Sequence, residues 1–380
     1  MAEFDVIVIG AGAMGSAALY HLARRGARAL CIERFAPGHD HGSSHGTSRI
    51  IRLGYYEHPS YVPLVRAAIP LWRQLESASG RKLMHTTGIV EIGKPDGALV
   101  QGTLASSRLH GLAHELLDAR EVMRRFPAFR LPSDYVGVWQ PDGGWLAAEP
   151  AVQAHVALAL AAGAQLRNGE TVRTIEPHGG GVGVVTDRGN YTAGKVIVAA
   201  GAWTQALLPG LPVRLRVTRQ AMAWFTPADP APFAPGRFPV FMLETAHGIH
   251  YGFPLQEAGL KIAKHFHRNE TADPDAYRRA VSAADESEIR AGLADFLPAA
   301  NGALRAAKTC LYTMTPDGDF VVDRMPGEPS IIVASPCSGH GFKFAPVIGE
   351  ILAELATESA THHDISRFRL GRFGTSMLGG

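Results

Sequence analysis

The sequence contains few cysteines, and those it has are widely spaced. Cys31, Cys310 and Cys337 are the three cysteines among 380 residues. An odd number at this spacing is unlike a disulfide framework or a zinc site, so we predict neither, and no metal. A chain without disulfides is typical of a reducing compartment, and we therefore expect a cytoplasmic protein.

The sequence also lacks an excess of charge of one sign. Its 37 lysines and arginines nearly balance 35 aspartates and glutamates, so we expect no nucleic acid and no membrane surface as partner. The longest apolar stretch, residues 151–166, is broken by polar side chains and favours a buried helix over a membrane span. The N-terminal residues show no signal-peptide pattern.

What remains is the composition of a globular protein. Hydrophobic residues make up 46% of the chain, which is ample for a packed core. At roughly 150 residues per domain, the length predicts two or three domains.

The N-terminal residues carry the most specific pattern. An apolar strand expected at residues 5–9 runs into the turn Gly10-Ala11-Gly12-Ala13-Met14-Gly15. A helical stretch at 16–25 follows, and then a second strand at 29–32 that ends before Glu33. This order of strand, glycine turn, helix, strand and acid is typical of dinucleotide-binding units.

Each of these residues has a physical task in such a unit. Gly10 permits the tight turn, Gly12 lets a pyrophosphate approach the backbone, and Gly15 lets the helix pack closely on the strand. The helix N-terminus faces the phosphates, and the carboxylate of Glu33 accepts hydrogen bonds from a ribose, which disfavours a 2′-phosphate. The turn predicts a dinucleotide site and leaves FAD and NAD both open.

Apolar strands run into glycines at two further places, Gly201 and Gly339. Ligands of open α/β sheets bind at the carboxyl ends of the strands. One long ligand that touches three such ends favours FAD over NAD.

The pattern predicts an α/β fold with two domains. A Rossmann-like FAD-binding domain is expected to be discontinuous, and a second, strand-rich α+β domain is expected to bind substrate. The predicted ranges are 1–83, 145–212 and 317–380 for the first domain, and 84–144 and 213–316 for the second.

Several other segments could carry chemistry. In the loop Ser43–Arg52, Arg49 and Arg52 would share a face on a helical turn, and they indicate either a solvated surface or recognition of an anion. In a strand over residues 259–265, Lys261 and His265 would point the same way, although lysines in strands are usually solvated.

Two more segments are open to similar alternatives. Cys310 is by itself more typical of a small buried hydrophobe than of a reactive thiol. Gly339 and Gly341 precede a helix whose N-terminus could stabilise negative charge, and Lys343 could bind an anion nearby.

Six motifs in order resemble one family. They are GAGAMG, SSHGTSRIIR, AAGAW, HYGFP followed by GLKIAKH, TCLYTMTPDGDF and SGHGFKF. Over essentially its whole length the chain resembles the monomeric sarcosine oxidase and N-methyltryptophan oxidase family of D-amino-acid-oxidase-like flavoproteins.

The resemblance implies roles for individual residues. It implies FAD bound covalently through a thioether to Cys310, a substrate carboxylate held by Arg52 and Lys343, and Lys261 near flavin N5 promoting the reaction with oxygen. The catalytic residues that we expect are Lys261, Arg49, His45, His265 and Tyr251, with Tyr251 also contacting substrate. The expected cofactor contacts are Gly10, Gly12, Gly15, Glu33, Ser43, Arg49, Val172, Gly201, Cys310, Gly339, Gly341 and Lys343.

The implied reaction is the oxidation of a secondary amine such as sarcosine, an N-methyl amino acid or a cyclic imino acid. A hydride passes to flavin N5, and oxygen is the acceptor that leaves as hydrogen peroxide. We expect a monomer whose partners are this small-molecule amine and oxygen. The alternatives are a dehydrogenase with another electron acceptor, which Lys261 disfavours, and a flavin-binding protein of RNA modification or regulation, which the charge balance disfavours.

The chain departs from many relatives near the implied site. It has Ser44 and Thr47 where a second His and an Asp are common, and Pro336-Cys337 where a Gly-Phe pair is common. Lys264 matches the tryptophan-type relatives. These differences predict an altered substrate pocket and leave the particular amine open.

Overall fold

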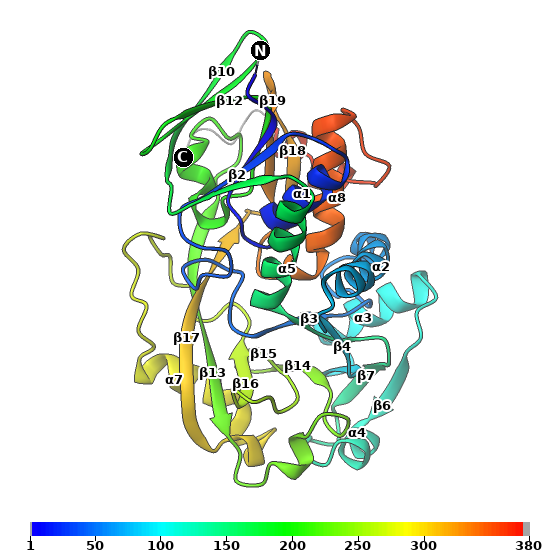
Figure 1. The fold of residues 1–380 in the computed structure, drawn as a ribbon. Coiled ribbons are helices and arrows are strands. Elements are labelled where there is room, and N and C mark those ends of the chain that lie inside the picture. The colour runs from blue at the N-terminus through cyan, green and yellow to red at the C-terminus, as the bar shows by residue number, and fades with distance from the viewer. Residues whose placement is uncertain (1, 375–380) are drawn as a thin grey trace.

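The computed structural model describes residues 2–374, which form two large sheets with helices packed around them (Figure 1). The first sheet lies at the end where the chain begins, and the second lies at the other end of the molecule. A small three-stranded sheet is formed by β3 (Ser48–Ile51), β8 (Gly144–Ala147) and β4 (Met84–Thr86).

The first sheet has the order β10-β11-β12-β1-β2-β9, with β19 on β12 and β18 on β19. Its strands β1, β2, β9, β12 and β19 pair in parallel, and β10, β11 and β18 pair antiparallel. The bounds are β1 Phe4–Ile9, β2 Ala29–Glu33, β9 Gln165–Asn168, β10 Val172–His178, β11 Gly181–Thr186, β12 Asn190–Val198, β18 Val321–Met325 and β19 Glu328–Ser335.

Helices cover one face of the first sheet. They are α1 (Ala13–Arg24), α2 (Val62–Ser79), α5 (Ala148–Ala161) and α8 (Ala345–Thr357). Alternate strand residues such as Val8 and Ile197 belong to the core beneath these helices, whereas Ile7 and Val198 belong to a second core on the opposite face. Burial on both faces explains why these strands are continuous apolar runs.

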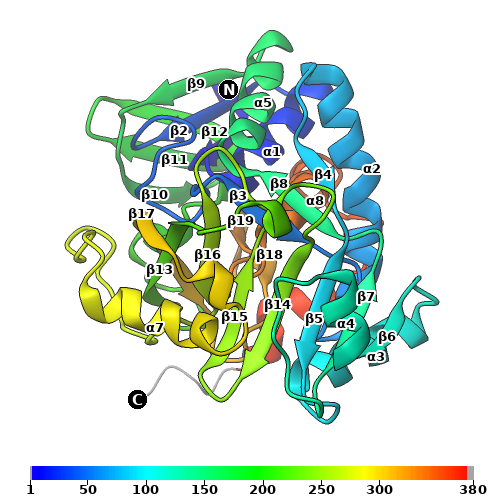
Figure 2. The same ribbon diagram turned by 90° about the horizontal axis from the view of Figure 1, so that it is seen from below.

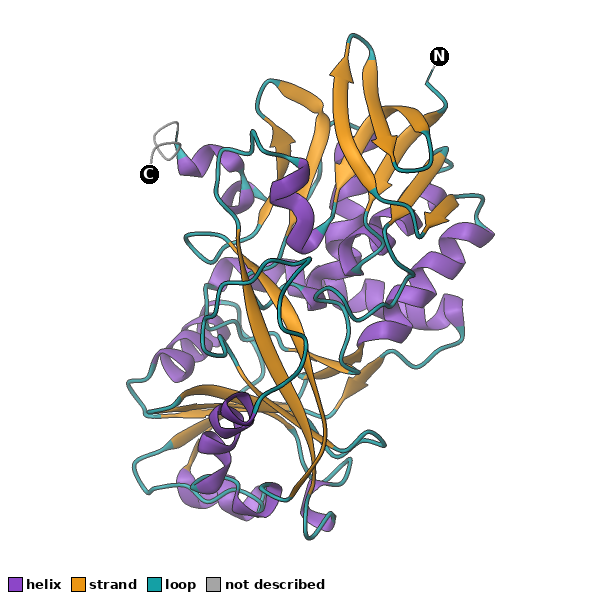
Figure 3. Ribbon diagram, turned by 90° about the vertical axis from the view of Figure 1, so that its left-hand side faces the viewer, coloured by secondary structure: helices purple, strands orange, loops and turns teal. Residues whose placement is uncertain are grey.

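The second sheet has the order β17-β13-β16-β15-β14-β5-β7-β6. Figure 3 shows the long pair β13 and β17 reaching from this sheet toward the first one. The bounds are β5 Ile89–Gly93, β6 Glu115–Asp118, β7 Val136–Gln140, β13 Arg216–Thr226, β14 Val240–Thr245, β15 Gly248–Gly252, β16 Leu260–Lys264 and β17 Ala303–Met314.

Shorter helices accompany the second sheet, and Figure 2 shows α3, α4 and α7 around it. Their bounds are α3 Ala98–Leu109, α4 Ala119–Arg125 and α7 Ala283–Ala294, and the short α6 is Thr204–Leu207. The mixed α/β class is confirmed. Because the two large sheets draw on different chain segments, the division into two domains stands as our proposal.

One local expectation was wrong. Arg49 lies within strand β3 and Arg52 follows it, so the two arginines do not share a helical turn. Pairing of β3 with β8 explains the difference, because the ladder fixes an extended backbone. Helix α3 is exposed on one face only, since Leu99 and Leu104 are buried against the second sheet.

No helix among residues 2–374 combines the length and the apolar composition needed to cross a bilayer.

Candidate functional site

A cavity of about 440 Å³ extends from the glycine turn after β1 to the face of the second sheet. The three glycine-ended strands meet in it, because Gly10, Gly201 and Gly339 all contribute to its wall. Convergence of strand ends from three distant segments is what the sequence led us to expect for one long ligand.

The glycine turn is built so that larger residues do not fit. Gly10 has φ +96°, and a Cβ there would lie 2.7 Å from the carbonyl oxygen of Ala199. A Cβ on Gly15 would lie 1.8 Å from the carbonyl oxygen of Gly10. Gly12 differs, because its nearest neighbour would be Ser44 Oγ at 3.4 Å and it lines the cavity. The turn therefore leaves open space at Gly12, where a pyrophosphate can approach.

Glu33 lies at the end of β2 and is almost fully buried beside this turn. Its carboxylate accepts hydrogen bonds from the backbone N–H groups of Ala11 (2.6 Å) and Phe35 (2.8 Å). Val172 lines the same end of the cavity. Glu33 thus stabilises the turn and also lines the cavity. The space formed by Gly10, Gly12 and Glu33 fits the ADP half of FAD.

Arg52 lies at the opposite end of the cavity and is 2% exposed. Its guanidinium donates to both carboxylate oxygens of Glu57, at 2.8 and 2.6 Å, and to the carbonyl of Gly54. The buried carboxylate of Glu91 lies 3.6 Å from Arg52 Nε. Burial works against the charged form, but the two carboxylates outweigh it and raise the pKa of Arg52.

Lys343 is the second buried cation at this end. Its Nζ donates to the carbonyl of His340 at 2.7 Å and to the hydroxyl of Tyr55 at 3.3 Å. Both cations lie against the Tyr55 ring, at 4.3 Å for Arg52 and 5.0 Å for Lys343 from the ring centre. Burial lowers the pKa of the Lys343 ammonium to about 7.

Tyr251, His265 and Tyr312 line the cavity from the second sheet. His265 Nδ1 lies 3.4 Å from the Tyr312 hydroxyl, and no group among the described residues hydrogen-bonds to its buried Nε2. Burial lowers the pKa of His265 to about 3, so the ring is neutral at pH 7. Burial also raises the pKa of Tyr251 to about 12.

Cys310 lies on β17 and lines the cavity between its two ends. The thiol is free, and burial raises its pKa. Arg49 is close enough to act on Cys310 electrostatically, and it donates to the carbonyls of Ser43 (2.8 Å) and Ser48 (2.9 Å). Ser43 in turn donates to the carbonyl of Leu311, which ties this loop to the strand that bears the cysteine.

The structure brings most of the expected site residues together in one cavity. Those that line it are Gly10, Gly12, Glu33, Ser43, Arg49, Arg52, Val172, Gly201, Tyr251, His265, Cys310, Gly339, Gly341 and Lys343. Gly15, His45 and Lys261 are not part of its wall. Gly15 packs beneath the turn, and His45 is 1% exposed with a pKa that burial lowers to about 3.

Lys261 contradicts the expectation that a strand lysine is solvated. It is fully buried, and its Nζ donates to the carbonyls of Gly46 (2.6 Å) and Ser48 (2.7 Å). Burial lowers its pKa well below the usual value. The reason is that both faces of β16 are covered, since Ile262 belongs to one hydrophobic core and Ala263, on the same face as Lys261, belongs to another.

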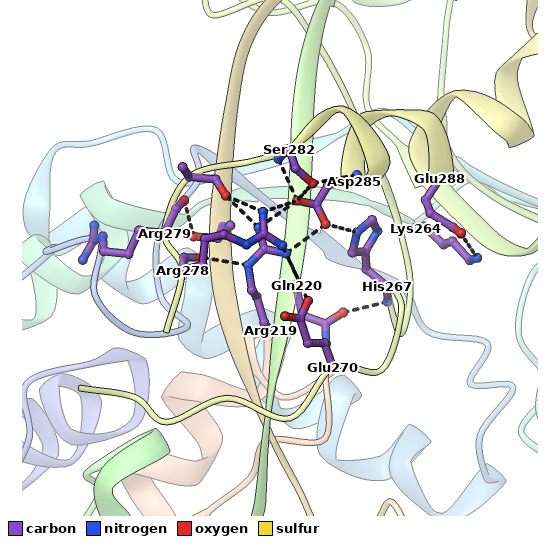
Figure 4. A network of polar contacts seen from close by, with 12 residues as sticks. Arg219, Gln220, Lys264, His267, Glu270, Arg278, Arg279, Ser282, Asp285 and Glu288 are labelled. Carbon is purple, nitrogen blue, oxygen red and sulfur yellow. Dashed lines mark hydrogen bonds and ion pairs between the residues drawn. The ribbon is translucent and has the colours of Figure 1, made fainter. Parts of the chain in front are cut away.

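A buried polar network holds the segment that carries His265 (Figure 4). Arg219 makes a paired contact with both oxygens of Asp285 at 2.9 Å, and Asp285 also meets His267 Nε2 at 3.1 Å. The backbone N–H of His267 donates to Gln220 Oε1 at 2.8 Å. Strand β13, helix α7 and the His265 segment are therefore tied together, which fixes one wall of the cavity.

Residue types alone did not reveal the acidic partners of Arg52. Glu57 is five residues from Arg52, and that proximity was an available signal. Glu91 lies on β5 in the second sheet, and no local sequence pattern indicated that it lies near Arg52. Tyr312 follows Cys310 by two residues and was not singled out either.

Comparison with known proteins decides the family. The chain matches the model for DAO, the FAD dependent oxidoreductases, over residues 5–355. The chain belongs to this family of FAD-dependent oxidoreductases. Its dependence on FAD follows, and the choice of FAD over NAD is confirmed.

Individual relatives agree with this placement. The chain is 41% identical to a monomeric sarcosine oxidase from Streptomyces avermitilis, with 96% of each chain covered. It is 38% identical to an N-methyl-L-tryptophan oxidase from Yersinia pestis, over 98% of this chain and all of the relative. The family resemblance drawn from the sequence motifs is thereby confirmed.

A solved structure is similar at the level of the whole fold. The open form of NikD, described as an unusual amino acid oxidase essential for nikkomycin biosynthesis, superimposes with a TM-score of 0.84 at 33% identity. The match covers 96% of this chain and 97% of that chain.

Proposed function

We propose that this flavoenzyme oxidises a small secondary amino acid, such as sarcosine, an N-methyl amino acid or a cyclic imino acid, with oxygen as the acceptor. The products are an imine, which water hydrolyses, and hydrogen peroxide. The observation that carries the proposal is the pair of buried cations, Arg52 and Lys343, at the cavity end opposite the glycine turn. Two buried cations in the wall of one cavity suit a substrate carboxylate.

The chain's own residues position the substrate. FAD, when bound, supplies the acceptor for the two electrons of the amine, and Gly10, Gly12 and Glu33 would hold its ADP half. Arg52 and Lys343 bind the carboxylate, and binding requires Glu57 to share the Arg52 guanidinium or to move aside. Holding the reacting carbon in one orientation lowers the barrier without any protein nucleophile.

His265 and Tyr251 contribute the polar contacts along the rest of the cavity. Neutral His265 leaves Nε2 free among the described residues, so it can accept a hydrogen bond from the substrate N–H or donate one, depending on its tautomer. Tyr251 remains protonated and can donate its hydroxyl proton.

Oxygen is proposed to react near Lys261. The buried ammonium would stabilise negative charge that develops on oxygen as it is reduced. His45, in the loop before β3, and Arg49, on β3, flank this side of the site, and Arg49 adds a second fixed positive charge.

Cys310 is proposed to bind FAD covalently through a thioether. Its support is its position in the wall of the cavity and the family resemblance. Acid precipitation tests it directly, because covalently bound flavin stays in the pellet. Cys310→Ser should release the flavin to the supernatant, whereas Cys31→Ser, in the buried core beneath the helices, should not. Free flavin from the unmutated protein would remove Cys310 from this role.

The central experiment is a substrate screen under two conditions. Sarcosine, other N-methyl amino acids, proline and pipecolate are mixed with the purified protein without oxygen, and flavin absorbance reports reduction. Oxygen is then admitted and peroxide is measured. Glycine serves as the primary-amine control for sarcosine. If a substrate reduces the flavin but oxygen restores it no faster than it restores free reduced flavin, the protein is a dehydrogenase and the oxidase proposal is wrong.

We also propose that the protein works as a cytoplasmic monomer. The name of the sarcosine oxidase relative and the three free cysteines support these proposals. Sedimentation and cell fractionation test them.

A further inference from the structure

The turn Gly46-Thr47-Ser48, between the cavity loop and β3, has an unusual backbone. Thr47 has φ +66°, and the Ser48 N–H donates to the carbonyl of Gly46 at 2.8 Å. A three-residue turn of this hand is rare and strained, and more so with a β-branched residue at its centre. Such a conformation persists only where the surroundings impose it.

Two charged side chains clamp this turn from different parts of the fold. Glu149, in the first turn of α5, accepts hydrogen bonds from the N–H of Gly46 (2.7 Å) and of Thr47 (3.1 Å). Lys261, on β16, donates to the carbonyls of Gly46 and Ser48. The carboxylate holds the turn by its N–H groups, and the ammonium holds it by its carbonyl groups.

One peptide group connects the two charges. The peptide between Gly46 and Thr47 presents its N–H to Glu149 and its C=O to Lys261. Hydrogen bonds in such a chain polarise one another, so each strengthens the next. The negative charge of Glu149 therefore favours the charged form of Lys261 through this peptide.

Lys261 has few other sources of negative charge. The groups that act on it electrostatically are Arg49, which disfavours the ammonium, and Cys310 and Glu149, which favour it. The neighbouring His45 is neutral, since burial lowers its pKa to about 3. The cysteine thiol is uncharged at pH 7, because burial raises its pKa. Glu149 is the one carboxylate in this set.

From this geometry we infer that Glu149 is a positioning residue for Lys261, fixing its ammonium and sustaining its charge through the Gly46–Thr47 peptide. The inference rests on the proposed function, in which Lys261 assists the reduction of oxygen. In that step oxygen takes two electrons from the reduced cofactor and two protons, and leaves as hydrogen peroxide.

Glu149 does not touch the proposed substrate site. It lines a second cavity, of about 480 Å³, together with Thr47 and Arg305, and that cavity shares no described residue with the first. A change at Glu149 should therefore act on the oxygen reaction and spare the reaction with amine.

The experiment separates the two half-reactions in Glu149→Gln. We expect reoxidation of the reduced enzyme by oxygen to slow by about 10-fold or more, while reduction by amine changes less than about twofold. Glu76→Gln is the matched control, because Glu76 also accepts two backbone N–H bonds, from Leu83 (2.8 Å) and Met84 (2.9 Å), and lines neither cavity. It should leave both rates unchanged.

The charge of Lys261 gives a readout independent of turnover. In Glu149→Gln the loss of a nearby negative charge lowers the pKa of Lys261, so the pH above which reoxidation declines should move downward. Titration of the lysine Cε resonances by NMR, with Lys261→Met to assign the signal, measures that pKa directly. Glu149→Asp keeps the charge and should restore the titration midpoint even where the rate stays low.

The outcomes distinguish the role of Glu149 from the proposed oxidase function. Unchanged reoxidation and an unmoved Lys261 titration in Glu149→Gln would overturn the role of Glu149 and leave the oxidase proposal intact. Failure of every amine to reduce the unmutated enzyme would overturn the proposed function itself. If the Gln variant does not fold, the Asp variant must show a slowed reoxidation with an unshifted titration, and equal rates in it would reject the positioning role.

Discussion

Replacing Lys343 with Met isolates one charge in the proposed carboxylate site. Lys343 is 4% exposed and donates to the His340 carbonyl and the Tyr55 hydroxyl. Methionine is unbranched and of similar length, so it can fill the space without the ammonium. Lys343→Met should weaken the binding of small carboxylates and leave the fold in place.

The expected magnitude depends on pH. A hydrogen bond to a charged group contributes about 1.5–3 kcal/mol, which is roughly a 10- to 150-fold change in Kd. Burial lowers the pKa of Lys343 to about 7. About nine in ten free molecules thus carry the ammonium at pH 6, and about one in a hundred at pH 9. The ratio of the Kd of Lys343→Met to the Kd of the unmutated protein should be largest at pH 6 and approach one at high pH.

Binding of a carboxylate shifts the pH dependence of this Kd ratio. A bound carboxylate favours the ammonium, so the pKa of Lys343 is higher in the complex than in the free protein. The ratio should therefore decline at a somewhat higher pH than the free-enzyme pKa alone indicates.

The assay is a titration with acetate or propionate, followed by the change in flavin absorbance, from pH 6 to pH 9. Lys82→Met is the control, because Lys82 is an exposed lysine that pairs with Glu76 outside the cavity. A Kd for Lys343→Met within about twofold of the unmutated value at pH 6, or a ratio that does not vary with pH, would refute a role for the Lys343 charge.

Two further substitutions test other parts of the site, and a change of pH tests the stability of the fold. Gly12→Ala should fold, because its Cβ meets only Ser44 Oγ at 3.4 Å, yet FAD content after purification should fall sharply because that Cβ enters the cavity. Glu57→Gln should lower the Kd of acetate several-fold by freeing the Arg52 guanidinium, and an unchanged Kd would show that the pair does not open. Acidification should destabilise the fold between pH 6.5 and 5, before most carboxylates titrate, in proportion to the number of histidines buried in the neutral form. They include His21, His45, His155 and His265, each with a pKa that burial lowers to about 3, and His340, with a pKa that burial lowers to about 4. Each binds a proton near pH 6.5 only when unfolded, so each contributes a slope of up to about 1.4 kcal/mol per pH unit below that value, and urea unfolding at several pH values measures it.

The nucleotide end of the site could be predicted because its determinants are contiguous. From Gly10 to Glu33, each residue acts on neighbours within one strand–turn–helix–strand unit, so spacing alone encodes the geometry. The structure adds that Glu33 bonds to the backbone of its own turn. Spacing therefore predicted the strand, turn, helix and acid, whereas the contact of Glu33 with its own turn required the structure.

The far end of the site depends on contacts between distant segments. Lys261 and Glu149 act on one turn from β16 and α5, and nothing in the spacing of either segment encodes that meeting. Likewise, no sequence pattern indicated that Lys261 is buried, because its burial depends on how side chains from other strands cover that face of β16. Family resemblance named Lys261, but the physical basis of its setting appeared only in the structure.

Residue types at the far end predicted an anion site, and the structure makes that prediction conditional on pH. Burial raises the pKa of Glu91 to about 7, and Arg52, despite the opposing effect of burial, lowers that of Glu57 to about 2. Below pH 7, with Lys343 charged and Glu91 protonated, the four groups carry one excess positive charge. Above pH 7 Lys343 is neutral and Glu91 is ionised, so the four groups carry one excess negative charge. The same cavity end therefore attracts a carboxylate in mildly acidic solution and resists it in alkaline solution, although the residue types Arg52 and Lys343 by themselves indicate a cationic site.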